Sequence, residues 1–166
     1  MTSDSGLPTT FRTRKARPTG LAVAALGIVV LNVSPFLDWV ENTDDATVYS
    51  GYETDSLIPF IAYLGIGLLV ALGLAYQRAH RNQHRGLTLV SLAVAVAAAL
   101  QSLAFAIDPM GALERGENLE VQYGVWVALI GAVIWAAGSA LFAQDVEGDD
   151  DEVDHRHVAD PAGYGR

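Results

Sequence analysis

The chain of 166 residues contains no cysteine. It can therefore form no disulfide, bind no metal through a thiolate and carry out no thiol chemistry, which excludes iron–sulfur ligation and cysteine redox catalysis. Motifs for other chemistry are missing too: the sequence has no phosphate-binding glycine loop, no activated serine arrangement and no zinc-protease helix motif. These absences predict a protein that is not an enzyme and carries no cofactor and no metal.

Charge is also scarce, at 17% of the residues against 51% hydrophobic residues. Four long segments are almost free of it: 20–40, 57–76, 86–107 and 123–143. As helices with a rise of about 1.5 Å per residue, each would cross the roughly 30 Å of hydrocarbon in a bilayer. Four such runs with short polar connections are hard to reconcile with a soluble core. The pattern predicts an all-α integral membrane protein, a four-helix transmembrane bundle over 20–143.

The middle of each span lacks Lys, Arg, His and Glu. Buried ionisable groups mark proton relays and ion pathways in membranes, so their absence argues against a pump or a proton-coupled carrier. Asp38 is the one acid near a helix interior, and it lies about one turn from the predicted end of the first span. We interpret Asp38 as an interfacial carboxylate, the alternative being a proton-relay acid.

Basic residues occur mainly in two clusters, one before the first span and one between the second and third: Arg12, Arg14, Lys15 and Arg17, then Arg78, Arg81 and Arg85. Loop 41–56 has five acids and no base, and loop 108–122 has four acids and one base. Lys and Arg remain on the cytoplasmic side, so both termini are predicted to be cytoplasmic, in a multi-pass protein of the cytoplasmic membrane. The first span is not followed by a cleavage site and is predicted to be a retained anchor.

Three segments lie outside the predicted spans. Residues 1–19 form a basic arm and residues 144–166 an acidic tail, and both are predicted to be disordered because they have little apolar surface to bury. His155 and His157 lie among the acids of the tail, as metal ligands of low selectivity or simply as solvated side chains. Loop 41–56 contains apolar and aromatic residues, which favours a short ordered cap.

Two amides lie at similar depth, Asn32 in the first span and Gln101 in the third. Ser34 and Ser102 lie beside them and either join an interhelical polar contact or bond the backbone of their own helices. An amide exposed to lipid is costly, so each is predicted to point into the bundle and to form an interhelical polar contact. One interpretation is a polar site for a headgroup, an ion or a partner helix; the other is hydrogen bonding that only joins the helices. Pro35 predicts a kink or unwinding near Leu31, which either bends the helix or shapes a cavity.

Small residues recur at helical spacing in the last three spans. Those predicted to pack helices are Gly67, Ala71, Ala95, Gly124, Ala128, Gly131 and Gly138. Such residues let membrane helices approach closely, either within the bundle or with another subunit. Aromatic residues predicted at the outer interface are Trp39, Tyr49, Tyr52, Tyr123 and Trp126, with Tyr76 and Phe142 at the inner one. Trp135 lies mid-span and must face lipid or pack inside.

The segment "NVSPFLDWV" followed by "SGYETD" resembles small four-span membrane proteins common in actinobacteria. Many of these end the first helix in Leu-Pro-Trp and carry Ser-Gly-Phe in the next loop; here Pro35-Phe36 and Ser50-Gly51-Tyr52 stand in those places. The similarity covers 21–76. It implies a cytoplasmic-membrane location in such a bacterium, and the group has no established activity to carry over.

Three functions are compatible with these features. The first is a non-enzymatic accessory or scaffold subunit of a larger membrane complex, with membrane lipids and a membrane-protein partner or a second copy as its contacts and no nucleic acid. The second is a small transporter or lipid-binding protein using the level of Asn32 and Gln101. The third, a membrane enzyme or metal sensor, requires clustered carboxylates from the loops 41–56 and 108–122.

Overall fold

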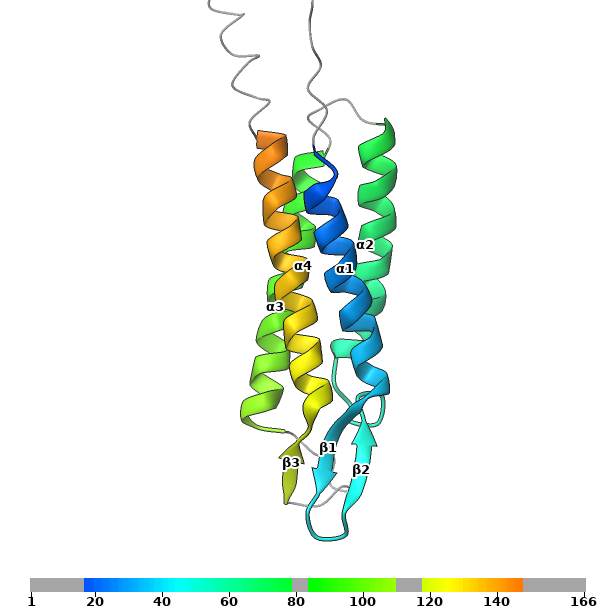
Figure 1. The fold of residues 1–166 in the computed structure, drawn as a ribbon, viewed down its shortest axis with the longest axis vertical. Coiled ribbons are helices and arrows are strands. Elements are labelled where there is room, and N and C mark those ends of the chain that lie inside the picture. The colour runs from blue at the N-terminus through cyan, green and yellow to red at the C-terminus, as the bar shows by residue number, and fades with distance from the viewer. Residues whose placement is uncertain (1–16, 79–83, 110–117, 148–166) are drawn as a thin grey trace, which may run out of the picture.

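The computed structural model describes residues 17–78, 84–109 and 118–147. This part is mostly helical, with four long helices: α1 (Thr19–Val33), α2 (Ile58–Arg78), α3 (His84–Ile107) and α4 (Tyr123–Glu147). All four are long and apolar enough to cross a membrane. They run alternately in opposite directions, so that α1 begins and α4 ends at the same end of the bundle (Figure 1).

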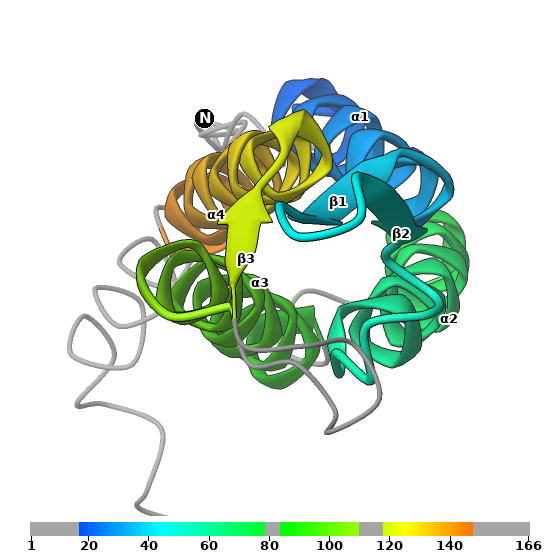
Figure 2. The ribbon, with the colours of Figure 1, turned by 90° about the horizontal axis from the view of Figure 1, so that it is seen from below.

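Viewed along the bundle, the helices form a ring in the order of the chain (Figure 2). α4 packs along both α1 and α3, whereas α2 makes fewer contacts with its two neighbours. α1 and α3 therefore occupy opposite corners of the ring. Trp135 of α4 fills the space between the helices, with 0% of its surface exposed.

The first helix ends earlier than the predicted span 20–40. α1 stops at Val33, two residues beyond Leu31, near which a kink or unwinding was predicted, and a 3-10 turn, η1 (Ser34–Phe36), follows it. Pro35 has no N–H to continue the helical ladder, and its fixed φ suits the first turn of a new element. The segment Asp38–Asn42 then forms a strand, so the prediction of helix up to residue 40 is wrong.

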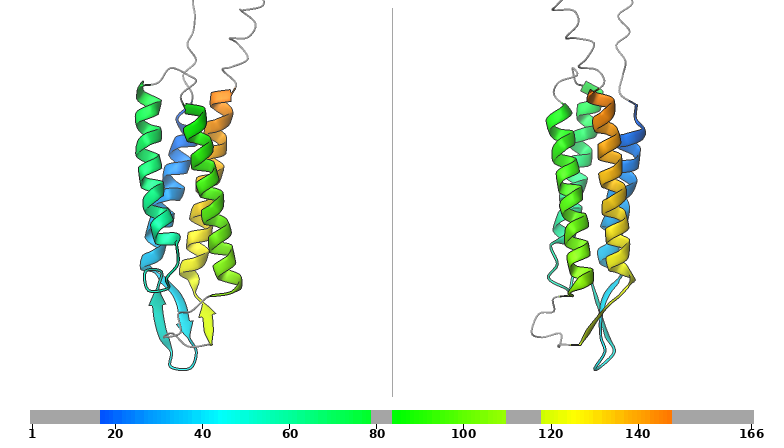
Figure 3. Two further views of the ribbon diagram at one scale, coloured as in Figure 1. Left: turned by 180° about the vertical axis from the view of Figure 1, so that it is seen from behind. Right: turned by 90° about the vertical axis from the view of Figure 1, so that its left-hand side faces the viewer.

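A small sheet closes the end of the bundle away from α1's first residue, and the fold is therefore not purely helical as predicted. Its strands are β1 (Asp38–Asn42), β2 (Thr47–Ser50) and β3 (Leu119–Val121), in the antiparallel order β2-β1-β3. Figure 3 shows the sheet extending beyond the helix ends. It joins the first interhelical segment to the residues just before α4.

The hairpin between β1 and β2 is shaped by short polar side chains. The Asp44 N–H donates to Asn42 Oδ1 at 2.9 Å, and the Thr47 N–H donates to Asp45 Oδ1 at 3.0 Å. Ala46 adopts a left-handed φ of 57° between them. Side chains that bond their own backbone two residues on are typical of turns. The cap expected over 41–56 is thus a defined β-hairpin with a third strand beside it.

The disordered ends predicted for 1–19 and 144–166 lie mostly outside the described residues. Within the described part, Thr19 already belongs to α1 and α4 continues to Glu147. His155 and His157 lie outside it as well.

Candidate functional site

Asn32 joins α1 to α2. Its Nδ2 donates to the Ile28 carbonyl of its own helix at 2.8 Å and to the Ala62 carbonyl of α2 at 3.0 Å. Both N–H groups of the amide are therefore satisfied by backbone oxygens. The side chain acts as an interhelical contact, although with a different partner from the one at its predicted depth.

Gln101 does not meet Asn32. It is half-buried on α3 and hydrogen-bonds to no other residue that the structure describes. Equal depth is not enough, because α1 and α3 stand at opposite corners of the ring (Figure 2). The predicted polar level thus divides into a satisfied amide on α1 and an unpaired one on α3.

Ser34 and Ser102 are buried but do not link helices. The Ser34 hydroxyl donates to the Leu31 carbonyl at 2.8 Å, and the Ser102 hydroxyl donates to the Ala98 carbonyl at 2.9 Å. Each therefore bonds the backbone of its own helix three or four residues back, a common way for serine to satisfy itself in an apolar helix. Of the two roles predicted for these serines, the structure therefore shows the bond to their own backbone and not the interhelical contact.

The polar contact that crosses the bundle is one the sequence did not reveal. Trp135 Nε1 donates to Ser91 Oγ at 3.0 Å, and Ser91 Oγ lies 3.0 Å from Ser139 Oγ. All three side chains are buried. A tryptophan in mid-span carries an N–H that needs an acceptor, and this requirement was the available signal.

Trp135 contacts all three other helices. Its indole donates to α3, its backbone lies against Gly27 of α1, and its ring lies 3.1 Å from where a Cβ on Gly65 of α2 would stand. Of the two predicted alternatives, lipid or interior, the structure places Trp135 inside. The centre of the bundle is occupied by this side chain.

Glycines bring α1 and α4 into backbone contact. A Cβ on Gly131 would lie 2.7 Å from the Leu31 nitrogen, and a Cβ on Gly138 would overlap the backbone of Ala24. Ala128 and Ala95 are fully buried in the same core. On α1, Gly20 and Gly27 make the matching approach, and the predicted packing residues included no member of this helix.

Gly124 serves the cap. A Cβ there would lie 2.6 Å from the Asp38 carbonyl oxygen and would overlap the Trp39 ring. Trp39 is fully buried, donates from Nε1 to the Ser34 carbonyl at 2.7 Å and packs edge-on against Phe105 at 5.4 Å. Trp39 was predicted at the membrane interface; its buried ring fixes the sheet to the helix ends.

Two of the predicted packing residues lie elsewhere. A Cβ on Gly67 would meet nothing within 4 Å, and Gly67 is exposed on the outer face of α2. Ala71 is half-buried. Small-residue spacing marks a helix face without saying which way that face turns, and α2 turns a different one toward the core, with Ala62 and Leu68.

Four carboxylates of the cap each accept a hydrogen bond from a different residue. The acceptors and their donors are Asp38 with Tyr123, Glu41 with Gln122, Asp44 with Asn118, and Glu53 with Ser50. In the ranges 17–78, 84–109 and 118–147, no group of three His, Cys, Asp or Glu residues could hold a metal ion. Glu114 and Glu117, invoked for an acidic site, lie outside those ranges.

Tyr52 and Tyr63 join the cap to α2 through a hydrogen bond of 2.7 Å between their hydroxyl groups. The bond favours the neutral phenol and, with a smaller contribution from burial, raises the pKa of Tyr52 from 10.0 to about 12. Phe36 packs edge-on against Tyr52 with ring centroids 5.0 Å apart. Three segments meet here: η1, helix α2 and the loop that follows β2.

Comparisons of the chain with protein-family models, with curated proteins and with solved structures found no match. What the described part can do is therefore argued from its geometry. The functional candidates are the satisfied Asn32 amide, the Gln101 amide without a partner among the described residues, the buried Trp135 inside the bundle and the acidic cap.

Proposed function

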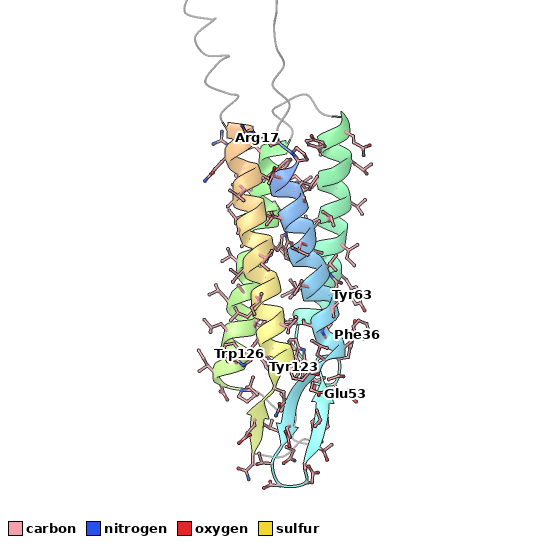
Figure 4. All side chains as sticks on the ribbon, in the orientation of Figure 1. Arg17, Phe36, Glu53, Tyr63, Tyr123 and Trp126 are labelled. Atoms are coloured by element: carbon pink, nitrogen blue, oxygen red, sulfur yellow. The ribbon has the colours of Figure 1, made fainter. Side chains whose placement is uncertain are left out.

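We propose that the chain is a multi-pass protein of the cytoplasmic membrane with both termini in the cytoplasm. The charge at the two ends of the bundle supports this. The Lys and Arg residues of the described part are Arg17, Arg78 and Arg85, all at the end where α1 begins, and Figure 4 places Arg17 opposite the sheet. The described acids lie mainly at the sheet end. Basic residues are retained on the cytoplasmic side of spans.

Within that membrane, the function is that of a non-enzymatic accessory or scaffold subunit of a larger complex. The observation that carries this proposal is the filled centre of the bundle, where Trp135 touches α1, α2 and α3 and bonds Ser91. A transport path needs polar groups that face a passage. Here the indole N–H has an acceptor and the two serine hydroxyls share a hydrogen bond, so the interior at the level of Trp135 offers a substrate little to bind.

The cap supports the same proposal. Trp39 and Gly124 lock the sheet onto the helix ends, and its carboxylates are already hydrogen-bonded to neighbours. The result is a pre-formed surface rather than a reactive site. Because pre-formed surfaces lose little entropy on association, such a cap suits protein contacts.

A second candidate is a small transporter or lipid-binding protein that uses the outer half of the bundle. One observation favours it: the half-buried Gln101 amide has no hydrogen-bond partner among the described residues. In hydrocarbon, an unpaired amide costs free energy, and a bound polar ligand would offset that cost. The satisfied Asn32 amide offers no companion group at this level.

The test is purification of the full chain in nanodiscs at native expression, followed by mass spectrometry of proteins and lipids. Three forms are compared: the parent, a deletion of residues 148–166 that leaves α4 whole, and a full-length tail with its acids changed to Asn and Gln. The third form is the matched control, since it keeps length and removes charge.

The accessory function predicts a stoichiometric protein partner, recovered also when that partner is tagged, and lost or weakened in both altered forms. A chain that purifies alone with one defined lipid or small molecule, released by Gln101→Leu, would favour the second candidate instead. A lone chain with no bound molecule would contradict both.

A further inference from the structure

An exposed apolar patch lies where α1 and α2 meet the cap. We call it the interfacial patch and define it as Phe36, Tyr52, Leu57, Phe60 and Tyr63. Phe36 and Phe60 expose 71% and 69% of their surfaces, and Leu57 exposes 60%. Figure 4 shows Phe36 and Tyr63 at the helix ends beside the sheet, at a level similar to Trp126 on the opposite side. The patch contains no charged residue.

Direct contacts make the patch one surface. Phe36 packs on Tyr52 and Tyr52 bonds Tyr63, which connects η1, the loop after β2 and α2. Phe60 and Tyr63 are three residues apart on α2 and lie on neighbouring positions of its surface, and Leu57 directly precedes that helix. The surface is therefore fixed by the fold.

The tyrosine pair has a hydrogen-bond donor to spare. Two phenol hydroxyls share one hydrogen bond of 2.7 Å, which uses one O–H and leaves the other. Neither hydroxyl has another partner among the described residues. The remaining O–H therefore needs an acceptor from the surroundings.

The patch continues into the apolar outer face of α2. The exposed residues Phe60, Tyr63, Gly67, Val70 and Leu74 recur every three or four positions. That face is the one lipid would cover if α2 spans the membrane. Aromatic rings with polar tips favour the boundary between acyl chains and headgroups, where the ring is in hydrocarbon and the tip meets polar atoms.

We infer that the interfacial patch lies in the headgroup boundary of the leaflet on the sheet side, where the spare tyrosine hydroxyl donates to an ester or phosphate oxygen of a phospholipid. This inference rests on the proposed membrane insertion. It assigns the patch a lipid partner and gives the acidic cap a fixed height above the bilayer. Trp39, buried under the cap, takes no part in this anchoring.

Depth measurement by electron paramagnetic resonance tests the inference. The chain has no cysteine, so single replacements carry a nitroxide label in phosphatidylcholine vesicles. The labelled variants are Leu57→Cys in the patch, Leu100→Cys on the exposed face of α3 within its apolar run and Val48→Cys on β2. Collisions with oxygen, which collects in hydrocarbon, are compared with collisions with a water-soluble nickel chelate.

We expect the ratio of oxygen to nickel collisions to rank Leu100→Cys highest, Leu57→Cys intermediate and Val48→Cys lowest. In Leu57→Cys, adding Tyr52→Phe and Tyr63→Phe keeps both rings and removes the polar tether. The ratio at position 57 is then expected to rise toward the value at position 100, because a patch without its polar tether lies deeper in the hydrocarbon. Tyr123→Phe, which removes a hydroxyl bonded to Asp38, is the matched control and leaves the ratio at position 57 unchanged.

Each other outcome contradicts the inference in a distinct way. Equal nickel access at positions 57 and 48, with position 100 protected, places the patch in water while the protein is inserted. Low access of both reagents at position 57 identifies a protein contact there. An unchanged ratio in the variant with Tyr52→Phe and Tyr63→Phe shows that neither of these tyrosine hydroxyls bonds a phospholipid. Nickel access at position 100 overturns the membrane insertion itself.

Discussion

Glycine 131 shows what one residue contributes to this bundle. Helices in lipid gain nothing from leaving water, so their association depends on close van der Waals contact and on hydrogen bonds. Gly131 allows the backbone of α4 to approach that of α1 at Leu31, and Gly138 repeats the approach near Ala24. Gly67 is also a glycine in a membrane-length helix, but no neighbouring backbone lies close to it.

Gly131→Leu should therefore destabilise the bundle by about 3 kcal/mol or more, since the new side chain meets backbone that cannot move aside. Gly67→Leu, the matched control, adds its side chain to open space on α2 and should change the unfolding free energy by less than about 0.5 kcal/mol. Unfolding in mixed micelles and membrane abundance both measure this. If Gly131→Leu reached the same membrane abundance as the parent, close backbone contact between α1 and α4 would not be needed for stability.

The two amides allow a second comparison at this scale. Asn32→Leu loses the hydrogen bond to the Ala62 carbonyl and should cost about 0.6 to 2 kcal/mol. It should therefore lower abundance less than Gly131→Leu does. Gln101→Leu removes an amide without a partner in the described part and should leave stability unchanged or raise it. The same unfolding assay decides, and a larger loss for Gln101→Leu than for Asn32→Leu would show that Gln101 has a partner.

Tyr52 gives the third residue-scale prediction, which concerns pH. Its pKa is raised from 10.0 to about 12, mainly by the bond with Tyr63, so the folded state favours the neutral phenol. This contribution to stability is fully present below pH 10 and is lost as the pH rises toward 12. Subtracting the phenolate absorbance of Tyr52→Phe from that of the parent should give this titration, and in Tyr63→Phe the pKa of Tyr52 should move back toward 10.0. A parent titration already centred near 10.0 would contradict the contact.

At the scale of elements, the helices could be predicted and the strands could not. Long charge-free runs identify the four helices, and α2, α3 and α4 begin within two residues of their predicted starts. β3 has three residues and β1 carries an irregular register between Asp38 and Val40, so neither shows the alternation by which strands are predicted. Trp39 and Val40 extend the apolar run of α1, which hides the boundary that Pro35 sets.

The site was harder to predict than the helices because spacing defines a face without giving its direction. Gly131, Gly138 and Ala128 do face a neighbouring helix, but Gly67 on α2 does not. The predicted contact between Asn32 and Gln101 failed for a similar reason. It was based on their similar depth, and depth along the bundle does not say which helices are adjacent. The order of helices in the ring is a tertiary property.

Helices α3 and α4 are joined by a hydrogen-bond chain that yields the fourth prediction. Ser91→Ala removes the acceptor of Trp135 Nε1 and the partner of Ser139 together, and should cost about 1 to 2 kcal/mol. Ser139→Ala, the matched change, leaves the Trp135 bond intact and should cost less. Unfolding free energies, with indole fluorescence as a report on position 135, measure both. Equal losses would mean that the indole bond adds nothing.

The whole molecule has two unlike ends. One collects the described arginines and the other carries an acidic, folded sheet. This asymmetry is what the proposed orientation uses, and it leads to the fifth prediction. Val48→Cys on β2 should react with a membrane-impermeant maleimide in intact cells, whereas Gln144→Cys near the end of α4 should react only after the cells are opened. Reaction at position 144 in intact cells would invert the topology.

The close contact between α1 and α4 has a consequence for biosynthesis. α1 is made first, and its principal neighbour is the last helix to leave the ribosome. Until then Gly20 and Gly27 of α1 have no helix packed against them, β1 has no β3 to pair with, and Trp135 is missing from the bundle interior. Nascent chains that stop before α4 would therefore present several unfinished surfaces to quality-control proteases. The arrival of the final segment closes the ring and the sheet in one event.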